Sequence, residues 1–292
     1  MKTKYIIIGK RGNLAKAIMK ILEASYGSNS FIGLSSKEVI SFLKQNNSYT
    51  TVKNDDYLEF IWCSGTSKAR SGKENCEIDF SSFNSFIEVI RKMKIDNCRI
   101  TFISSGGAVY GNNAGIVNEN SDVNPESYYA KMKVDCENLL NRLQREDGVG
   151  VAILRLANIY GGFIHQSSNG AVGALIAGAK DELEFKLSVA LCSTKQYGVY
   201  EDYSSTIINF LSKSIDNFRY DSKQNIYSTH QYSITDLVEK VKLYFNKEIN
   251  MRGNLELPEE TVILNSVKSA ISEETKWNSL ENYLISRYPK TP

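Results

Sequence analysis

Short apolar runs along the chain alternate with segments whose apolar residues recur at helical spacing. Five runs are expected to be strands: residues 5–8, 31–34, 60–63, 100–103 and 151–154. Three segments have the spacing of amphipathic helices: residues 14–22, 80–93 and 129–143. The runs are almost continuously apolar, which is typical of strands that a parallel sheet buries on both faces. This alternation predicts βαβ units and an α/β fold of the Rossmann type, with a doubly wound parallel sheet.

The pattern loosens after Gly161. Three further helices are expected at 170–179, 234–245 and 279–288, and Ser233 is a suitable N-cap for the second of them. Residues 189–190 and 226–227 are weak strand candidates. We therefore predict a dinucleotide-binding Rossmann domain at residues 1–161. Residues 162–292 are predicted to form a smaller, mainly substrate-binding region, with segments that return to the main sheet.

The composition excludes several classes of protein. Of the 292 residues, 42% are hydrophobic, which is enough for a sizeable core. The formal net charge is +2 and the basic residues are scattered, which argues against a nucleic-acid partner. No stretch approaches the roughly 18 apolar residues of a membrane helix, and the apolar start is too short for a secretion signal. Five cysteines without a C-x-x-C pair and two histidines predict reduced thiols, no metal site and a cytoplasmic location.

A glycine-rich turn, residues 9–15, follows the first expected strand and opens the first expected helix. Gly9 permits a tight turn, Gly12 lets the backbone approach a pyrophosphate, and Ala15 is small enough for close packing of the helix on the sheet. The free N–H groups and the partial positive charge of the helix N-terminus favour phosphate binding there. An ordinary turn without a ligand is the structural alternative, because a G-x-x-G-x-x-A string alone is a weak signal.

The end of the second strand bears on the choice of cofactor. An NAD site usually places Asp or Glu there to hold the ribose hydroxyls, whereas this strand runs into Ser35, Ser36 and Lys37. These side chains, with Arg11 reaching across, are suited to a 2′-phosphate. The sequence therefore favours NADP(H) over NAD(H), unless Lys37 and Arg11 are only solvated surface charges.

Tyr129 and Lys133 are four residues apart on an expected helix and so share one face of it. A free tyrosine loses its proton only near pH 10, and an ammonium one turn away favours the phenolate. Tyr129 could then exchange a proton with a substrate C–O group while a hydride moves to or from the nicotinamide. A surface lysine beside a half-buried tyrosine is the structural alternative.

Four motifs occur in a characteristic order: the glycine turn, Ser104–Gly111 (SSGGAVYG), the Tyr129/Lys133 pair, and Arg155–Gly161 (RLANIYG). In these motifs the chain resembles the extended short-chain dehydrogenase/reductases, the NAD-dependent epimerase/dehydratase-type enzymes of nucleotide sugars. The resemblance covers residues 4–161 well and continues more faintly beyond them.

The resemblance implies roles for individual residues. Tyr129 would be the general acid/base, and Lys133 would support it and bind the nicotinamide ribose. Asn158 would contact the substrate diphosphate or the cofactor. His165 could line the substrate cleft as a second acid, and Lys195 could be a phosphate-binding cation, although both could equally be exposed polar residues. Cofactor contacts are expected from Gly9, Arg11, Gly12, Asn13, Leu14, Ser35, Ser36, Lys37, Cys63, Ser64, Gly65, Tyr129 and Lys133. By analogy with the family, the helices at 80–94 and 127–145 could pair in a homodimer.

One position departs from the family pattern. The hydroxyl residue that hydrogen-bonds the reacting oxygen usually lies four residues before the tyrosine of V-Y-G, and here that position is Gly106. Ser105 is our candidate for the missing hydroxyl, and Ser105 and Gly106 are expected to line the substrate site. Thr66 or Ser67 could donate instead, part of the chemistry could have been lost, and Ser104 and Ser105 could simply bond the backbone at the strand end.

Three functions are consistent with these observations. The leading hypothesis is NADP(H)-dependent reduction of a nucleotide-linked 4-keto deoxysugar in polysaccharide precursor synthesis. The alternative within enzymes is a nucleotide-sugar 4-epimerase with tightly bound NAD. A dehydratase would usually have an Asp-Glu pair where Gly106 and Gly107 stand. A non-catalytic NADP sensor or scaffold is the alternative of another class, although such a protein has no need of the Tyr129/Lys133 pair.

Overall fold

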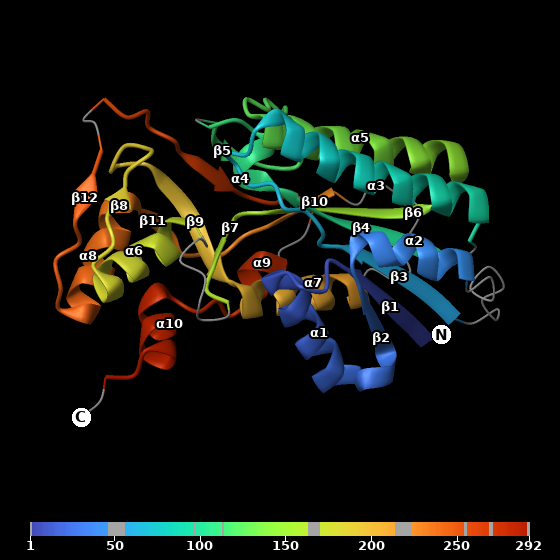
Figure 1. The fold of residues 1–292 in the computed structure, drawn as a ribbon, viewed down its shortest axis with the longest axis horizontal. Coiled ribbons are helices and arrows are strands. Elements are labelled where there is room, and N and C mark those ends of the chain that lie inside the picture. Colours follow the sequence, from blue (N-terminus) through green and yellow to red (C-terminus); the bar gives the residue numbers. More distant parts are fainter. Residues whose placement is uncertain are drawn as a thin grey trace.

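The structure is a computed structural model, and it describes residues 2–45, 56–95, 97–112, 114–162, 170–213, 223–253, 256–268 and 271–290. Figure 1 shows a large sheet flanked by helices on both sides, and a smaller part in which α6, α8 and α10 lie around short strands. Both chain ends are at the surface of this view, the N-terminus in the large part and the C-terminus beside the small one.

The large sheet has six strands, all parallel. Their spatial order is β10 (Lys223–Ile226), β6 (Gly150–Leu156), β4 (Cys98–Ser105), β3 (Asp56–Trp62), β1 (Lys2–Ile8) and β2 (Phe31–Leu34). The α/β fold with a Rossmann-type parallel sheet is thereby confirmed. The edge strand β10 comes from much later in the chain than its neighbour β6 and pairs with it through four residues, Lys223 to Ile226.

Helices bury both faces of this sheet. Helices α2 (Ser36–Gln45), α3 (Lys73–Met93) and α5 (Tyr128–Asp147) pack together on one face, and α1 (Asn13–Tyr26) and α7 (Tyr200–Lys213) on the other. The run Tyr5–Ile8 of β1 is apolar because both faces of the strand are buried there. Ile6 and Ile8 belong to the core under α3 and α5, whereas Tyr5 and Ile7 belong to the core with α1 and α7.

The smaller part is built on a second sheet. Its strands lie in the order β11 (Gln231–Ser233), β9 (Thr194–Val199), β13 (Val262–Leu264) and β5 (Gly115–Val117), and β7 (Asn158–Tyr160) also pairs with β9. The helices here are α6 (Gly170–Asp181), α8 (Ile234–Phe245) and α10 (Leu280–Arg287), which share one apolar core. Short elements complete the described chain: η1 (Ser28–Ser30), α4 (Gly106–Val109), β8 (Phe185–Lys186), β12 (Met251–Arg252) and α9 (Ile271–Glu274).

With one exception, the elements expected from periodicity are confirmed: β2 and α8 have the expected ends, and the others have shifted ends. Ser233 caps α8 in a full capping box with Asp236. The strand expected at 189–190 is wrong. The N–H of Ala190 donates to the carbonyl of Pro258, and the carbonyl of Ala190 accepts from Ser193, so this segment turns instead of pairing. Helices α2 and α7 were not expected. The division of the chain at residue 161 stays a prediction.

The outer faces of α3 and α5 bear on the expected homodimer. The exposed residues of α5 are mostly charged: Tyr128, Lys131, Asp135, Asn138, Arg142, Arg145, Glu146 and Asp147. Pairing through these helices stays a prediction. Among the helices that the structure describes, none combines the length and hydrophobicity needed to cross a bilayer.

Candidate active site

The glycine turn after β1 lies directly against the turn after β3. Gly9 has a φ of +102°, and a Cβ atom added to it would lie 2.8 Å from the backbone nitrogen of Ser64. Only glycine fits both the conformation and the space. The structure therefore brings two groups of expected cofactor residues together, the glycine turn and Cys63 to Gly65.

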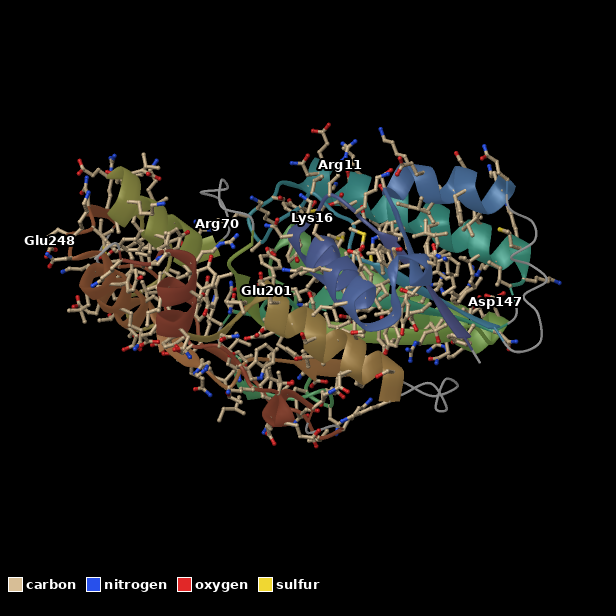
Figure 2. The ribbon with its side chains drawn as sticks, turned by 90° about the horizontal axis from the view of Figure 1, so that it is seen from below. Arg11, Lys16, Arg70, Asp147, Glu201 and Glu248 are labelled. Atoms are coloured by element: carbon tan, nitrogen blue, oxygen red, sulfur yellow. The ribbon has the colours of Figure 1, made fainter. Side chains whose placement is uncertain are left out.

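The first helical turn of α1 fits a pyrophosphate. Gly12 is its N-cap and donates its own N–H to the Gly9 carbonyl at 2.9 Å. No side chain of the described residues caps this helix, so its first N–H groups are open to an anion. Figure 2 shows Arg11 and Lys16 projecting near this end of α1. The Leu14 side chain is buried in the core, which leaves only its backbone for a ligand.

The end of β2 differs from the sequence interpretation. We expected no carboxylate here, but Glu38 folds back and accepts the N–H of Ser35 at 2.7 Å. Ser35 in turn caps α2 by accepting the Glu38 N–H at 3.2 Å, which completes a capping box. Lys10 of the glycine turn also binds Glu38, at 2.8 Å. These hydrogen bonds from Lys10 and Ser35 lower the pKa of Glu38 to about 2, so an anion stands where a 2′-phosphate was expected.

A second group of expected residues surrounds a small cavity under α5. Ser64, Gly65, Tyr129 and Lys133 line it together with Ser67. The Ser67 hydroxyl is buried without a hydrogen-bond partner among the described residues, and it is available to a bound group. Next to this cavity, burial raises the pKa of the Cys63 thiol to about 12, so Cys63 is an uncharged wall of the turn.

The catalytic pair lies at the start of α5. Ser127 caps the helix by accepting the Ala130 N–H at 3.1 Å, which fixes Tyr129 in the first turn. The Lys133 ammonium donates to the Ile103 carbonyl of β4 at 2.9 Å and lies 5.6 Å from the centre of the Tyr129 ring. Both side chains are half-buried. The helical spacing thus gives the expected proximity, with Lys133 anchored to the sheet.

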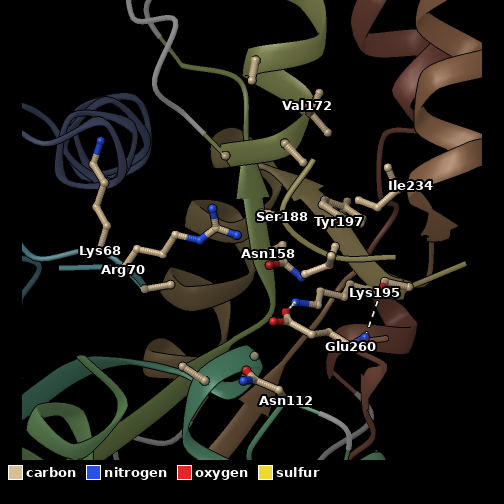
Figure 3. Close-up of a pocket in the computed structure, with 18 of the residues that line it drawn as sticks. Lys68, Arg70, Asn112, Asn158, Val172, Ser188, Lys195, Tyr197, Ile234 and Glu260 are labelled. Carbon is tan, nitrogen blue, oxygen red and sulfur yellow. Dashed lines mark hydrogen bonds and ion pairs between the residues drawn. The ribbon is translucent and has the colours of Figure 1, made fainter. Parts of the chain in front are cut away.

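A pocket of about 610 Å³ lies between the ends of the sheet strands and the smaller part (Figure 3). One end is formed by Ser105, Gly107, Ala108 and Ser127, next to the catalytic helix. The other end carries apolar side chains, Val172, Phe185, Leu187, Val189, Tyr197 and Ile234, beside the polar residues Lys186 and Ser188. Such a pocket fits an elongated ligand with one polar and one flat apolar end.

Packing beside the pocket explains why a glycine, Gly106, stands where the family usually has a hydroxyl residue. A Cβ atom at Gly106 would lie 2.4 Å from the Leu264 side chain of β13, so Gly106 faces the interior and not the pocket. Our expectation that Gly106 lines the substrate site is therefore wrong. Ser105, Gly107 and Ala108 form this wall of the pocket instead, and Ser105 is its hydroxyl residue.

Substituting the two glycines should separate these roles. We expect Gly106→Ser to lower the free energy of unfolding by about 1–3 kcal/mol, because the new side chain overpacks against Leu264. In contrast, a Cβ atom at Gly107 meets nothing closer than 3.8 Å, so Gly107→Ser should change stability by less than about 1 kcal/mol. Urea unfolding of both variants measures this difference, and equal losses would contradict the packing argument.

The Ser104 hydroxyl binds a side chain, whereas the alternative considered above was the backbone at the strand end. Its hydroxyl donates to the Glu137 carboxylate at 2.5 Å, and Arg155 binds the same carboxylate at 2.6 Å. Arg155 also donates to the Tyr110 hydroxyl at 2.9 Å, which itself donates to Asn225. Two of the four motifs behind the family resemblance, Ser104–Gly111 and Arg155–Gly161, therefore meet in one buried network.

The remaining candidates have mixed outcomes. Asn158 lines the pocket and donates to the Gln196 carbonyl at 3.1 Å. Lys195 lines it too, but Glu260 neutralises it at 2.6 Å. His165 lies outside the described residues. Sequence reasoning missed Arg70 and Glu260 on the pocket wall, because neither belongs to a motif.

Comparison with known proteins agrees with this architecture. Residues 64–220, more than half of the chain, match the NAD dependent epimerase/dehydratase family. The chain belongs to this family, so the expected class of NAD(P)-dependent enzymes of the extended short-chain dehydrogenase type is confirmed. A putative UDP-glucose 4-epimerase of Methanocaldococcus jannaschii is 44% identical over 78 residues, which are 26% of this chain and 25% of that protein.

Solved structures share the fold over nearly the whole chain. UDP-glucose 4-epimerase of Thermotoga maritima, solved with UDP-glucose, matches with a TM-score of 0.76 and 18% identity, covering 96% of this chain and 95% of that one. The Thermus thermophilus UDP-glucose 4-epimerase with NAD gives 0.74 at 14% identity, covering 94% and 93%. The Bacillus cereus UDP-glucuronic acid 4-epimerase, with UDP-glucuronic acid and NAD, gives 0.75 at 16% identity, covering 96% of each chain.

Proposed function

We propose that this protein is an NAD-dependent 4-epimerase of a nucleotide sugar. The observation that carries the proposal is the position of the Tyr129/Lys133 pair, beside the cofactor turns and next to the polar end of a 610 Å³ pocket. Family membership supports this function over a purely binding role. The similar epimerase structures support it over the 4-ketoreductase that we favoured from the sequence.

The residues of the chain have distinct tasks in this reaction. The chemistry that a bound nicotinamide supplies is reversible hydride transfer at C4 of the sugar. Tyr129 removes the proton of the 4-hydroxyl and returns it, with Lys133 favouring the phenolate. Ser105 hydrogen-bonds the same oxygen from the pocket wall. An epimerase presents both faces of a 4-keto sugar to one hydride site, and a roomy pocket allows that turn.

The β2 end supports NAD over NADP(H). The Glu38 carboxylate, held by Ser35 and Lys10, is suited to accept hydrogen bonds from ribose hydroxyls. The same carboxylate would repel a 2′-phosphate. The specific observation for the second candidate, an NADP(H)-dependent 4-ketoreductase, is that Arg11 and Lys37 are exposed nearby.

Cofactor release and a product assay test the proposal together. We expect acid treatment of the purified protein to release NAD and no NADP. We also expect incubation with UDP-glucose or UDP-glucuronic acid to yield the C4 epimer, without added nicotinamide and without net change in absorbance at the reduced nicotinamide band. Oxidation of NADPH on a nucleotide 4-keto sugar, with no epimer from either compound, would favour the ketoreductase instead.

A further inference from the structure

One loop of the pocket wall carries two cations and is fixed by several hydrogen bonds. It follows β3 and carries Lys68 and Arg70. The Asp79 carboxylate of α3 accepts the N–H of Thr66 at 2.9 Å and that of Ser67 at 2.8 Å, which fixes the start of the loop. The turn at 68–71 is closed by two reciprocal bonds, from the Lys68 N–H to the Ser71 hydroxyl and from the Ser71 N–H to the Lys68 carbonyl.

This loop presents Arg70 to the pocket. Figure 3 shows the guanidinium reaching from the loop toward the strand that carries Asn158, whereas Lys68 extends in another direction. In the described part of the chain, Arg70 has no ion pair or hydrogen bond. An arginine that lines a pocket on a pinned loop and has no internal partner is ready to bind an anion.

The pocket wall carries more cations than carboxylates. Four cations line it, namely Lys68, Arg70, Lys186 and Lys195, against the two carboxylates Glu126 and Glu260. Glu260 neutralises Lys195, and Glu126 is held by amides, including that of Asn112 at 2.8 Å. Lys68 extends away from Arg70 (Figure 3), so Arg70 is the cation that this loop presents to a ligand in the pocket.

The position of the loop indicates which part of a bound ligand lies nearest to Arg70. The start of the loop, Ser64 to Ser67, shares its cavity with Tyr129 and Lys133, and Arg70 lines the pocket with Ser105 and Gly107 at the reacting end. The opposite end of the pocket, with the apolar side chains of Phe185 and Ile234, suits the flat base of the nucleotide instead. A ligand laid along this pocket therefore brings its sugar nearest to Arg70.

We propose that Arg70 binds a carboxylate on the sugar, so that the preferred substrate is a nucleotide-linked hexuronate. The planar guanidinium donates two parallel N–H bonds to a carboxylate. A lysine cannot offer that pair of donors, and a neutral hydroxymethyl group on the sugar cannot offer the matching pair of acceptor oxygens. This inference rests on the proposed epimerase function and names its substrate class.

The test compares UDP-glucuronic acid with UDP-glucose in the full-length holoenzyme. We expect kcat/KM for 4-epimerisation to be higher with UDP-glucuronic acid. Arg70→Gln should lower that value by roughly 10- to 100-fold and change the value for UDP-glucose by less than about threefold. Arg70→Lys should restore only part of the preference. Lys73→Gln removes an equal charge from an exposed site at the start of α3 and should change neither value.

Other outcomes would overturn the inference. Equal losses on both substrates in Arg70→Gln would mean that Arg70 binds the diphosphate, and a wild-type preference for UDP-glucose would exclude the hexuronate. If neither compound is epimerised, the proposed epimerase function is wrong, but the role of Arg70 is still testable. Calorimetric binding of the two compounds then tests whether Arg70 recognises a carboxylate. Tighter binding of UDP-glucuronic acid that disappears in Arg70→Gln would still support carboxylate recognition, and equal binding of the two compounds would exclude it.

Discussion

Replacing Tyr129 with phenylalanine should nearly abolish turnover while the cofactor remains bound. The substitution removes one hydroxyl from a half-buried ring at the start of α5 and leaves the Lys133 bond to the Ile103 carbonyl intact. A positioned general acid/base typically contributes about 10²- to 10⁴-fold to the rate. We therefore expect kcat for epimerisation to fall in that range, as measured by product formation under saturating substrate.

Tyr128→Phe is the matched control, because Tyr128 is the neighbouring tyrosine on the same helix and is 53% exposed. It should leave kcat within about twofold of wild type. The amount of NAD released by acid should be equal in all three proteins. A Tyr129→Phe variant that keeps wild-type turnover would show that Tyr129 is not the proton-transfer group, and a variant that loses its NAD would show a binding role instead.

The sequence predicted the large sheet well because its information is local. The runs Tyr5–Ile8 of β1 and Val151–Leu154 of β6 are apolar on both faces, and each therefore indicates a buried parallel strand. Helix α7 was not predicted, although Tyr203, Ile207 and Leu211 recur at helical spacing. Strand β10 was only a weak candidate at residues 226–227, and its pairing with β6 is a long-range contact that the local pattern does not encode.

The residues of the candidate site likewise divide into those that local sequence predicts and those that long-range contacts place. Motif spacing predicted that the glycine turn, the turn after β3 and Tyr129 would share one edge of the sheet, since all of them follow parallel strands or lie above their ends. It could not predict that Leu264 occupies the space beside Gly106, because β13 lies far along the chain. Glu38 was within reach of local reasoning, since Ser35 and Glu38 have capping-box spacing. Arg70 belongs to no motif, and only the structure shows that it lies on a hydrogen-bonded loop beside the pocket.

The buried pair of Glu137 and Arg155 should dominate the stability of the region beneath the pocket. Both side chains are at most 4% exposed and lie 2.6 Å apart. Burial alone would lower the pKa of Arg155, but hydrogen bonds and charge from Glu137 and Tyr110 raise it, so Arg155 stays ionised. Removing one partner of such a pair typically costs about 3–5 kcal/mol, because the other charge is left buried without compensation. We expect Arg155→Met to lose that much in urea unfolding.

A second arginine provides the control. Arg91 pairs with three carboxylates, those of Glu88, Glu146 and Asp147, but it is partly exposed, so Arg91→Met should cost less than about 1 kcal/mol. The double variant Glu137→Gln/Arg155→Met should be more stable than Arg155→Met alone, since it removes the stranded charge. A single variant within about 1 kcal/mol of wild type would contradict this account. Because the Glu137 carboxylate also binds Ser104, next to Ser105, Arg155→Met should reduce kcat even at temperatures where the variant remains folded.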